Sequence, residues 1–369
     1  MRIGIITYHR AHNCGAMLQA WALKKALEKS GHEVDFPALN RVGEPQGRWL
    51  SKPIPRVGVF AQIRSILASA YCNMLSIPIE ELKRIRFSRF RKRFLKENVV
   101  AVSQLGDAYD AIIVGSDQVW KPAIAERWAP LFFGEILPNN LRRVAYALSY
   151  GDKELEGNEL DRAVMAIGNF DALSVREPIV KSQLQPFTKK ELKLVADPSL
   201  LISAGEYDEL ICDFDPPKTD YLFAYLLAAD KALVAKIREV AKKLGVGAII
   251  TVVYQYSRHN APKGLTYAVS PERMLGYVRD AKYVFAASFH GTAFSIIFGK
   301  SFVSLRPRAN DFTSRPGALL EEIGEQARLV HPGTSVDEII EKLRTRPVDW
   351  ASKLAHVREE SLEWLLKSL

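Results

Sequence analysis

The sequence predicts an α/β protein with two doubly wound domains that face each other across a cleft. Short apolar runs alternate with segments of helical periodicity, and this alternating series occurs twice along the 369 residues. A stretch rich in Asp and Pro, residues 213–217, lies between the two series and is typical of a linker. Strands that alternate with helices pair in parallel, and the helices then cover both faces of the sheet.

The first series begins with a buried strand at Arg2–Tyr8. Apolar residues then recur at helical spacing from Ala16 to Leu27, and Gly31 ends that helix. Glu33–Phe36 is a second strand, so the chain opens with a βαβ unit and a parallel sheet. Further strands are expected at Ala111–Val114, Val144–Leu148, Ala172–Val175 and Lys193–Val195.

The second series begins near Tyr221. Ser270 is a candidate N-cap for one of its helices. Its strands are expected at Tyr221–Leu227, Ala248–Val253, Tyr283–Ala287 and Phe302–Leu305. Its helices are expected at Lys231–Leu244, Pro271–Asp280 and Thr292–Phe298.

These series define two Rossmann-like domains. We assign residues 1–205 to the N-terminal domain, with an insertion at residues 40–107, and residues 206–347 to the C-terminal domain. Residues 348–369 form a final helix that is expected to pack back on the N-terminal domain. Ligands of such sheets bind at the carboxyl ends of the strands.

Composition excludes several classes of protein. Hydrophobic residues make up 48% and charged residues 25% of the chain, which is typical of a globular protein and excludes global disorder. The three cysteines form no CxxC pair, so a disulfide scaffold and a cysteine-built zinc site are excluded, and a reducing compartment fits. No other group of residues has metal-ligand spacing. No apolar run reaches 18 residues, which argues against a spanning helix.

The net charge of +9 comes from one segment. Lys83–Lys96 holds eight basic residues and no acid, and subtracting these eight leaves only +1 for the rest of the chain. Nucleic-acid binding, which needs a basic face on the domain itself, is therefore disfavoured.

Two helical stripes lie in the insertion, one from Ile63 to Met74 and one through Phe87, Phe90 and Phe94. They are either two ordinary helices with solvated Lys and Arg, or a basic amphipathic surface for anionic lipid or an anionic carrier-linked substrate. We expect Lys83–Lys96 to contribute to association with a membrane surface or an anionic acceptor, and not to fold stability.

The loop from His9 to Gly15 follows the first strand. A helix N-terminus with a nearby glycine can hold an anion, and Arg10 and His12 would add positive charge. The loop lacks a GxGxxG pattern, so it does not indicate a dinucleotide site. Equally, Asn13 could simply cap the helix while Gly15 makes the turn.

A second polar group follows the strand at Ala111–Val114. Gly115 allows the chain to turn, and Ser116, Asp117 and Gln118 would then project into the crevice. Carboxylates and amides bind sugars against an aromatic face, which Trp120 could supply. The alternative is a capped helix start with a core tryptophan.

A third group, Ser288 and His290, follows the strand at Tyr283–Ala287. Histidine is the usual general acid or base near neutral pH, and this one would lie at the edge of the second sheet beside Gly291. A structural histidine is the alternative.

Arginines follow several predicted strands. Guanidinium groups bind phosphate and carboxylate through paired hydrogen bonds, so a group of them at strand ends indicates a small polyanionic ligand. The arginines in question are Arg176, Arg306, Arg308 and Arg315.

Taken together, these segments resemble the polysaccharide pyruvyl transferase family over nearly the whole chain. The order and spacing of the matching segments make the resemblance specific. They are NCGAMLQAWAL (13–23), AIIVGSDQVW (111–120), VAYALSYG (144–151), SVRE (174–177), ADPSLL (196–201), SFHGTAFSIIFG (288–299) and DFTSR (311–315).

The resemblance implies a fold similar to the two-domain GT-B glycosyltransferases. It also implies transfer of a pyruvyl group from phosphoenolpyruvate to two hydroxyls of one sugar, which gives a cyclic ketal on an exopolysaccharide or cell-envelope polysaccharide, or on its lipid-linked precursor. No cofactor or metal is implied. The expected location is cytoplasmic or peripheral at the inner face of the membrane.

On this reading His290 is the catalytic acid/base. Ser288, Arg176, Arg306, Arg308 and Arg315 would bind phosphoenolpyruvate. The acceptor sugar would contact Asn13, Gly15, Gly115, Ser116, Asp117 and Gln118. A GT-B glycosyltransferase that uses a nucleotide sugar is the alternative enzyme, and a non-catalytic binding protein of the same fold is the third possibility.

Overall fold

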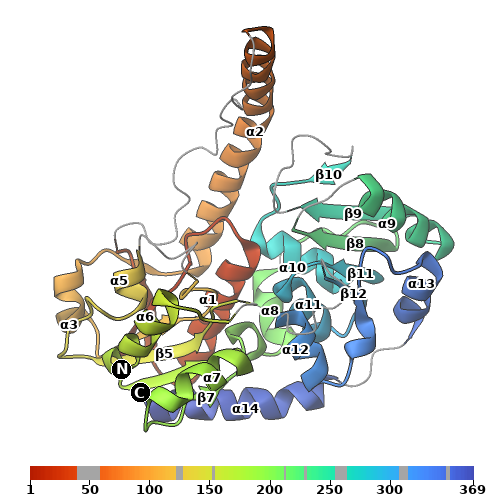
Figure 1. The fold of residues 1–369 in the computed structure, drawn as a ribbon. Helices are drawn as coiled ribbons and strands as arrows, with labels where there is room; N and C mark the ends of the chain where they lie inside the picture. The colour runs from red at the N-terminus through yellow and green to blue at the C-terminus, as the bar shows by residue number, and fades with distance from the viewer. Residues whose placement is uncertain are drawn as a thin grey trace.

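The computed structural model describes residues 1–39, 59–121, 128–151, 154–211, 213–227, 231–253, 264–306, 315–345 and 350–369. Within these ranges the chain forms two sheets, both with parallel strands, and they lie side by side with helices around them (Figure 1). The prediction of two doubly wound parallel-sheet domains is confirmed.

The first sheet has the strand order β3-β2-β1-β4-β5-β6-β7. Its order reverses between β1 and β4, which is where doubly wound sheets bind ligands at the carboxyl ends of their strands. The strands are β1 (Arg2–Ile6), β2 (Glu33–Pro37), β3 (Glu97–Asn98), β4 (Ala111–Gly115), β5 (Arg142–Leu148), β6 (Ala172–Val175) and β7 (Lys193–Leu194).

The second sheet repeats this pattern in the order β10-β9-β8-β11-β12-β13. Its reversal lies between β8 and β11, so each sheet has an equivalent place for a ligand. The strands are β8 (Tyr221–Leu226), β9 (Ala248–Val253), β10 (Leu265–Thr266), β11 (Tyr283–Ala286), β12 (Ser301–Leu305) and β13 (Leu329–Val330).

Apolar residues form one cluster that is shared by the two domains. It contains Leu18 of α1, Leu275 of α10, Phe294 of α11 and Leu365 of α14, so these helices pack together where the two domains meet. A separate cluster covers the other face of each sheet. The longer helices are α1 (Cys14–Lys29), α6 (Asn158–Ala166), α7 (Pro178–Leu184), α9 (Lys231–Lys243), α10 (Pro271–Asp280), α11 (Phe289–Ile297), α12 (Arg315–Glu322), α13 (Val336–Arg344) and α14 (Trp350–Ser368). The short ones are α3 (Leu105–Ala108), α5 (Ala129–Phe132) and α8 (Ala204–Tyr207).

The last helix, α14, contacts the N-terminal half of the chain. Arg142 donates a hydrogen bond from Nε to the Ser368 carbonyl (2.8 Å). The Ala196 amide donates to the Ser361 hydroxyl (2.9 Å). Figure 1 shows α14 running beneath both domains, so the helix joins them from one side.

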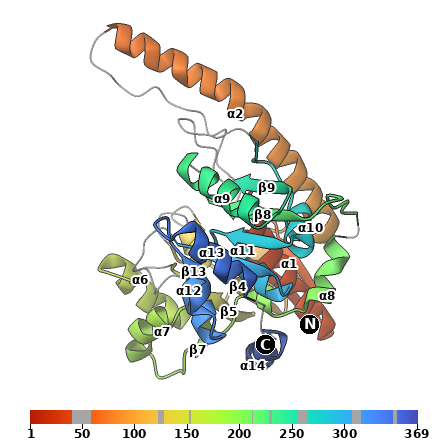
Figure 2. The same cartoon turned by 90° about the vertical axis from the view of Figure 1, so that its right-hand side faces the viewer.

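Helix α2 (Val59–Phe94) differs from the expectation of two helices in the insertion. It is one helix that continues through Pro78 and projects beyond both domains (Figures 1 and 2). A proline within a helix removes one backbone hydrogen bond, and here the residues on both sides of it remain helical. Among the described residues, no helix combines the length and apolarity needed to cross a bilayer.

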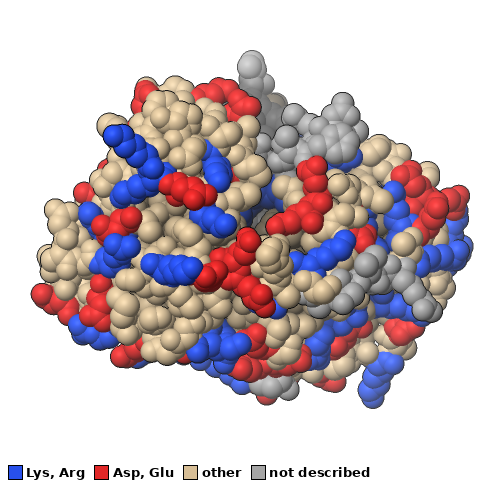
Figure 3. Space-filling view, turned by 90° about the horizontal axis from the view of Figure 1, so that it is seen from below, with Lys and Arg blue, Asp and Glu red and all other residues tan. Residues whose placement is uncertain are grey.

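The expectation that Lys83–Lys96 does not contribute to fold stability is wrong. Phe87 and Phe90 are buried in the shared apolar cluster. Arg91 pairs with Glu97 of the first sheet (3.2 Å), which holds this end of α2 against the domain. On the face seen from below, away from the projecting end of α2, Lys and Arg are interspersed with Asp and Glu (Figure 3).

Candidate active site

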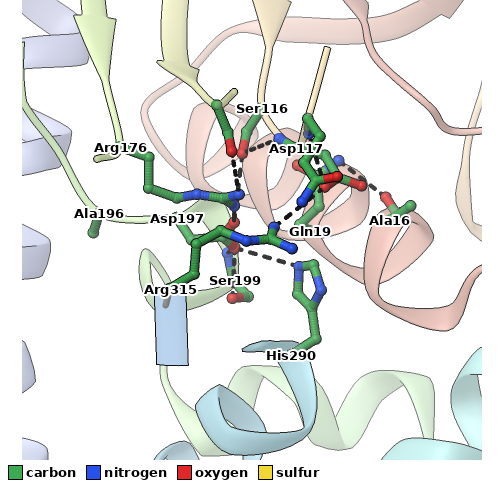
Figure 4. Close-up of polar contacts among 12 residues, drawn as sticks. Ala16, Gln19, Ser116, Asp117, Arg176, Ala196, Asp197, Ser199, His290 and Arg315 are labelled. Atoms are coloured by element: carbon green, nitrogen blue, oxygen red, sulfur yellow. Dashed lines mark hydrogen bonds and ion pairs between the residues drawn. The ribbon is translucent and has the colours of Figure 1, made fainter. Parts of the chain in front are cut away.

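Polar side chains from both domains meet where β4, β6 and β11 end. Asp117 follows β4, Arg176 follows β6, and His290 lies in the first turn of α11, just after β11. Arg315 begins α12. Figure 4 shows these side chains pointing toward one another around Asp197. Residues far apart in the sequence therefore form one cluster at the carboxyl edges of both sheets.

The centre of this cluster is the ion pair between Arg176 and Asp197. The Arg176 guanidinium bonds to Asp197 Oδ2 and also donates to the Ser149 hydroxyl (2.8 Å). Only 5% of the Arg176 side chain and none of the Asp197 side chain is exposed. A buried charge is stable only when it is paired and hydrogen-bonded, so each of these two residues requires the other.

Three other groups contact the Asp197 carboxylate. Oδ1 accepts hydrogen bonds from the Ser199 amide (2.9 Å) and hydroxyl (2.6 Å), and Oδ2 lies 3.5 Å from Ser116 Oγ. Burial works to raise the pKa of Asp197, but the charge of Arg176 and the proximity of His290 hold it below its usual value. Asp197 is therefore a carboxylate at neutral pH.

His290 lies between this carboxylate and helix α1. Its Nε2 is 3.8 Å from Asp197 Oδ1. Burial lowers the pKa of His290, and Arg176 and Arg315 lower it further, whereas Asp197 and Asp117 act in the opposite direction. The net pKa lies below that of an ordinary histidine, so the imidazole is neutral at pH 7.

Gly15 is the residue of α1 that His290 contacts. A Cβ atom at position 15 would lie only 2.2 Å from His290 Nδ1, so only glycine permits this approach. Gly15 has an ordinary helical position and does not make the turn that the sequence suggested. Its role in this structure is to admit a side chain of the other domain.

The loop that precedes α1 does not carry a free positive group. Asn13 caps the helix by accepting a hydrogen bond from the Ala16 amide (3.2 Å), as the simpler interpretation of the sequence held. Arg10 donates to Glu97 (2.7 Å). Cys14 is buried, and burial raises the pKa of its thiol, which does not suit a nucleophile.

The turn after β4 presents Asp117 to the site. Gly115 has a φ of +116°, which only glycine adopts readily, and Asp117 has a φ of +67°. The Asp117 amide donates to Ser116 Oγ (2.5 Å), and Asp117 Oδ1 accepts from the Gln118 amide (2.8 Å). Ser116 is fully buried, so of these residues Asp117 and Gln118 are the ones that remain partly exposed.

Trp120 does not provide an aromatic face for a sugar. It is buried, stacked on Phe133 with ring centroids 4.9 Å apart, and its Nε1 donates to the Phe132 carbonyl (3.0 Å). The alternative interpretation is therefore correct in the core tryptophan, but residues 116–120 form a turn and not the start of a helix. An indole of this size is buried because its hydrogen bond is satisfied inside the domain.

Arg315 approaches the site from the second domain. Its Nη1 lies 3.8 Å from Asp117 Oδ1. Phe289 lies near both arginines, with its ring centroid 5.0 Å from the Arg176 guanidinium carbon and 5.8 Å from that of Arg315. Two guanidinium groups from different domains thus flank one aromatic ring beside His290.

The other predicted binding residues have different positions. Ser288 caps α11, since its hydroxyl accepts a hydrogen bond from the Gly291 amide (3.0 Å). Arg306 is buried at the end of β12, where its amide donates to the Val330 carbonyl (3.0 Å). Arg308 lies outside the described residues.

Asp197 is the residue of this site that had no predicted role. It follows β7 and belongs to the segment ADPSLL, and an Asp that caps a short turn is an ordinary structural feature. Its burial beside Arg176 and His290 is visible only in three dimensions. Among the described residues, no group of three or more His, Cys, Asp or Glu side chains is arranged to hold a metal ion.

Two solved structures are similar to this chain in fold. The UDP-GlcNAc 2-epimerase from Neisseria meningitidis bound to UDP-GlcNAc has a TM-score of 0.52 at 12% identity, with 100% of both chains covered. UGT89C1 from Arabidopsis thaliana complexed with UDP-L-rhamnose has a TM-score of 0.50 at 12% identity, covering 98% of this chain and 94% of that one. At this identity the likeness concerns the fold, which is GT-B-like.

The sequence comparisons identify the family. A search of curated protein sequences found no match. A family model for the polysaccharide pyruvyl transferases matches residues 13–308, which include Asn13, Asp117, Arg176, Asp197 and His290. Because this match spans well over half of the chain, the protein belongs to the polysaccharide pyruvyl transferase family, which is a family of enzymes.

Proposed function

We propose that this enzyme transfers a pyruvyl group from phosphoenolpyruvate to two hydroxyls of one sugar and forms a cyclic ketal. The observation that carries the proposal is the position of His290, which lies beside the Asp197 carboxylate and in one cluster with the guanidinium groups of Arg176 and Arg315. One cluster therefore offers both a proton-transfer group and cations for a compact anion.

Phosphoenolpyruvate carries a phosphate and a carboxylate, so its site needs several cations. Arg315 is the best candidate to bind it directly, because 18% of its side chain is exposed at the meeting point of the domains. Arg176 is almost completely enclosed and is already bound to Asp197. We therefore assign Arg176 a supporting electrostatic role in donor binding.

The reaction moves protons in both of its steps, because each sugar hydroxyl loses one and C3 gains one. In the first step the oxygen of one sugar hydroxyl forms a bond to C2 of phosphoenolpyruvate, that hydroxyl loses its proton, and C3 gains one. In the second step the C2–O bond to phosphate breaks and phosphate takes the electron pair. The second hydroxyl then bonds to C2 and loses its proton to His290, which passes it to the released phosphate.

His290 is the proposed acid/base in both steps. A neutral imidazole can accept a proton from a hydroxyl, and Asp197 and Asp117 would stabilise the imidazolium that forms. A bound anion would counteract the lowering of the His290 pKa, because a negative charge favours the protonated form. The imidazolium could then donate its proton to C3.

The acceptor is proposed to lie against the first domain. Asp117 and Gln118 are partly exposed at the end of β4, where a sugar hydroxyl could reach His290. We infer that the sugar belongs to a cell-envelope or exopolysaccharide chain or its lipid-linked precursor, and that the enzyme acts at the cytoplasmic face of the membrane. The reaction as written requires no redox cofactor and no metal.

The test is incubation with phosphoenolpyruvate and a panel of sugar acceptors, with inorganic phosphate release and product mass as the readouts. We expect phosphate release that depends on the acceptor. The product should be about 70 Da heavier than the acceptor, which is the mass of pyruvic acid less one water. Arg162→Ala, which removes an exposed arginine paired with Glu135, is the matched control for loss of an arginine. Release of a nucleoside diphosphate from a UDP-sugar, without turnover of phosphoenolpyruvate, would overturn the proposal.

A further inference from the structure

The projecting half of α2 exposes an unusual amount of apolar surface. Phe60 is 90% exposed, Leu67 is 64% exposed, and Tyr71 and Met74 are also mostly exposed. Isolated apolar side chains on a surface are common, but a continuous row of them on one projecting helix indicates an interaction site. We call the exposed residues Val59, Phe60, Ile63, Ile66, Leu67, Tyr71 and Met74 the apolar stripe.

The apolar stripe lies on one face of the helix. Its members are spaced three, four and seven residues apart, so their side chains lie one above the other. Gln62, Ser65 and Ser69 lie on the opposite face and are less exposed. The amphipathic pattern is therefore the reverse of that of a surface helix, since here the apolar face is turned outward.

The same outward face becomes cationic toward the domains. Ile85 continues the row, followed at helical spacing by Arg89 and Lys92, which are exposed. Neither cation forms an ion pair within the part of the chain that the structure describes. Phe87 and Phe90, on the opposite face, are buried against the domain.

Acidic residues are scarce along this face. The first 21 residues of α2, Val59–Ile79, contain one charged residue, Arg64. The first acids after the stripe are Glu80 and Glu81, and they are paired with Lys83 (3.0 Å) and Arg84 (2.6 Å). The outward face of α2 thus combines exposed apolar side chains with unopposed positive charge.

We propose that the outward face of α2 docks on an anionic lipid bilayer, with the apolar stripe entering the interface and Arg89 and Lys92 lying against lipid phosphates. Amphipathic helices bind membranes in this way, by burying an apolar face while cations meet anionic headgroups. In Figure 2, α2 runs along one border of the molecule, so it can lie on a surface while the domains stay on the other side. This surface does not depend on the proposed reaction.

Charge favours a bilayer over a second copy of the chain. Helices that pair through an apolar stripe usually carry opposite charges beside it, and the stripe of α2 has only Arg64. Parallel pairing of two copies would place Arg89 and Lys92 next to the same cations of the other copy. Antiparallel pairing would place Arg89 and Lys92 against the apolar stripe of the other copy.

The experiment is flotation of the full chain with vesicles of phosphatidylcholine alone or phosphatidylcholine with 30% phosphatidylglycerol. We expect binding to the anionic vesicles that decreases as salt is raised, because cations contribute to it. The triple variant Ile63→Ser, Leu67→Ser, Tyr71→Ser should lose at least ten-fold in bound fraction to either vesicle. Arg89→Gln with Lys92→Gln should lose several-fold with anionic vesicles only.

Two matched controls replace equivalent side chains elsewhere. Val99→Ser, Met165→Ser and Phe187→Ser remove three exposed apolar residues from other surfaces, and this variant should bind vesicles as the wild type does. Lys218→Gln with Lys242→Gln serves the same purpose for two exposed cations.

Circular dichroism and thermal melting show that each variant is folded. The proposal is overturned if the wild type does not float with anionic vesicles, or if the stripe variant floats as well as the wild type. It is also overturned if sedimentation velocity shows a dimer that the stripe variant dissociates while neither protein binds vesicles. Loss of pyruvyl transfer does not bear on these outcomes.

Discussion

The two domains contribute to the site in different ways. On the first-domain side, Arg176 is bound to both Asp197 and Ser149, and the two charged side chains are almost fully enclosed. On the second-domain side, His290 lies 3.8 Å from Asp197, and Arg315 lies 3.8 Å from Asp117. The first-domain half of the site is part of that domain's interior. The second-domain half reaches this interior only because the two domains pack together.

This difference separates a buried ion pair, which supports the fold, from side chains of the second domain that lie beside it. A buried ion pair loses its compensation when one partner is removed, so the first-domain half cannot be changed without a cost in stability. His290 and Arg315 hold no comparable buried charge in place. Their loss should therefore affect catalysis and binding while the protein stays folded.

The largest effect on activity is expected for His290→Ala. Removing a positioned general acid or base lowers the rate by roughly 10²–10⁴. We expect kcat to fall by that factor, with a modest change in the KM for phosphoenolpyruvate and a melting temperature near that of the wild type. Steady-state kinetics and calorimetry measure both, and wild-type turnover in this variant would remove the assignment.

The largest effect on stability is expected for Arg176→Gln. This variant leaves the Asp197 carboxylate buried without a cation, which costs about 3–5 kcal/mol of unfolding free energy. The control is Arg279→Gln, which removes an arginine that is paired with Asp280 and Asp208 nearer the surface and should cost about 1 kcal/mol or less. Equal costs in urea unfolding would show that the buried Arg176–Asp197 pair matters no more to stability than an ion pair near the surface.

Arg315→Ala should act mainly on donor affinity. A hydrogen bond to a charged group is worth about 1.5–3 kcal/mol, so the KM for phosphoenolpyruvate should rise by roughly 10–100-fold. Stability should change less than in Arg176→Gln, because 18% of the Arg315 side chain is exposed whereas only 5% of the Arg176 side chain is. A variant with unchanged KM and strongly reduced kcat would instead place Arg315 in the chemical step.

Gly15→Ala tests the approach of the two halves. The added methyl group would overlap His290, and such overpacking costs about 1–3 kcal/mol. Activity should fall by about ten-fold or more if the site must close in this arrangement. Gly168→Ala is the control, because a Cβ there meets nothing within 4 Å. Full activity of Gly15→Ala would mean that catalysis does not need this contact.

Asp197→Asn should have the most specific effect on catalysis, a shift of the pH profile, in addition to the stability cost of leaving Arg176 without this partner. The Asp197 charge favours the imidazolium form of His290, so its removal lets burial, Arg176 and Arg315 lower the pKa of His290 further. The acidic limb of kcat/KM should therefore move to lower pH by about one unit. Ser199→Ala keeps the charge but loses a hydrogen bond to it, and should leave the limb in place. An unmoved limb in a folded Asp197→Asn protein would contradict the coupling.

Helix α2 shows where sequence patterns reach their limit. Periodicity identified both apolar stripes, at residues 63–74 and 87–94, because helical spacing is a local property. It could not tell that Phe87 and Phe90 enter the core while Phe60 and Leu67 stay exposed. Burial depends on what the rest of the chain places against each face, and the two stripes have similar residue types.

The sequence by itself determined the alternation of strands and helices, and therefore the parallel sheets, because neighbouring residues set backbone periodicity and strand length. It also determined that Asp117, Arg176 and His290 follow strands, and parallel strands end at one edge of a sheet. Only the tertiary structure decided that Asp197 joins them, that Trp120 lies in the core, and that Gly15 admits His290. The physical reason is that such contacts join residues far apart in the chain. They form only when the two domains pack through a shared core, and the spacing of neighbouring residues does not encode how the domains pack.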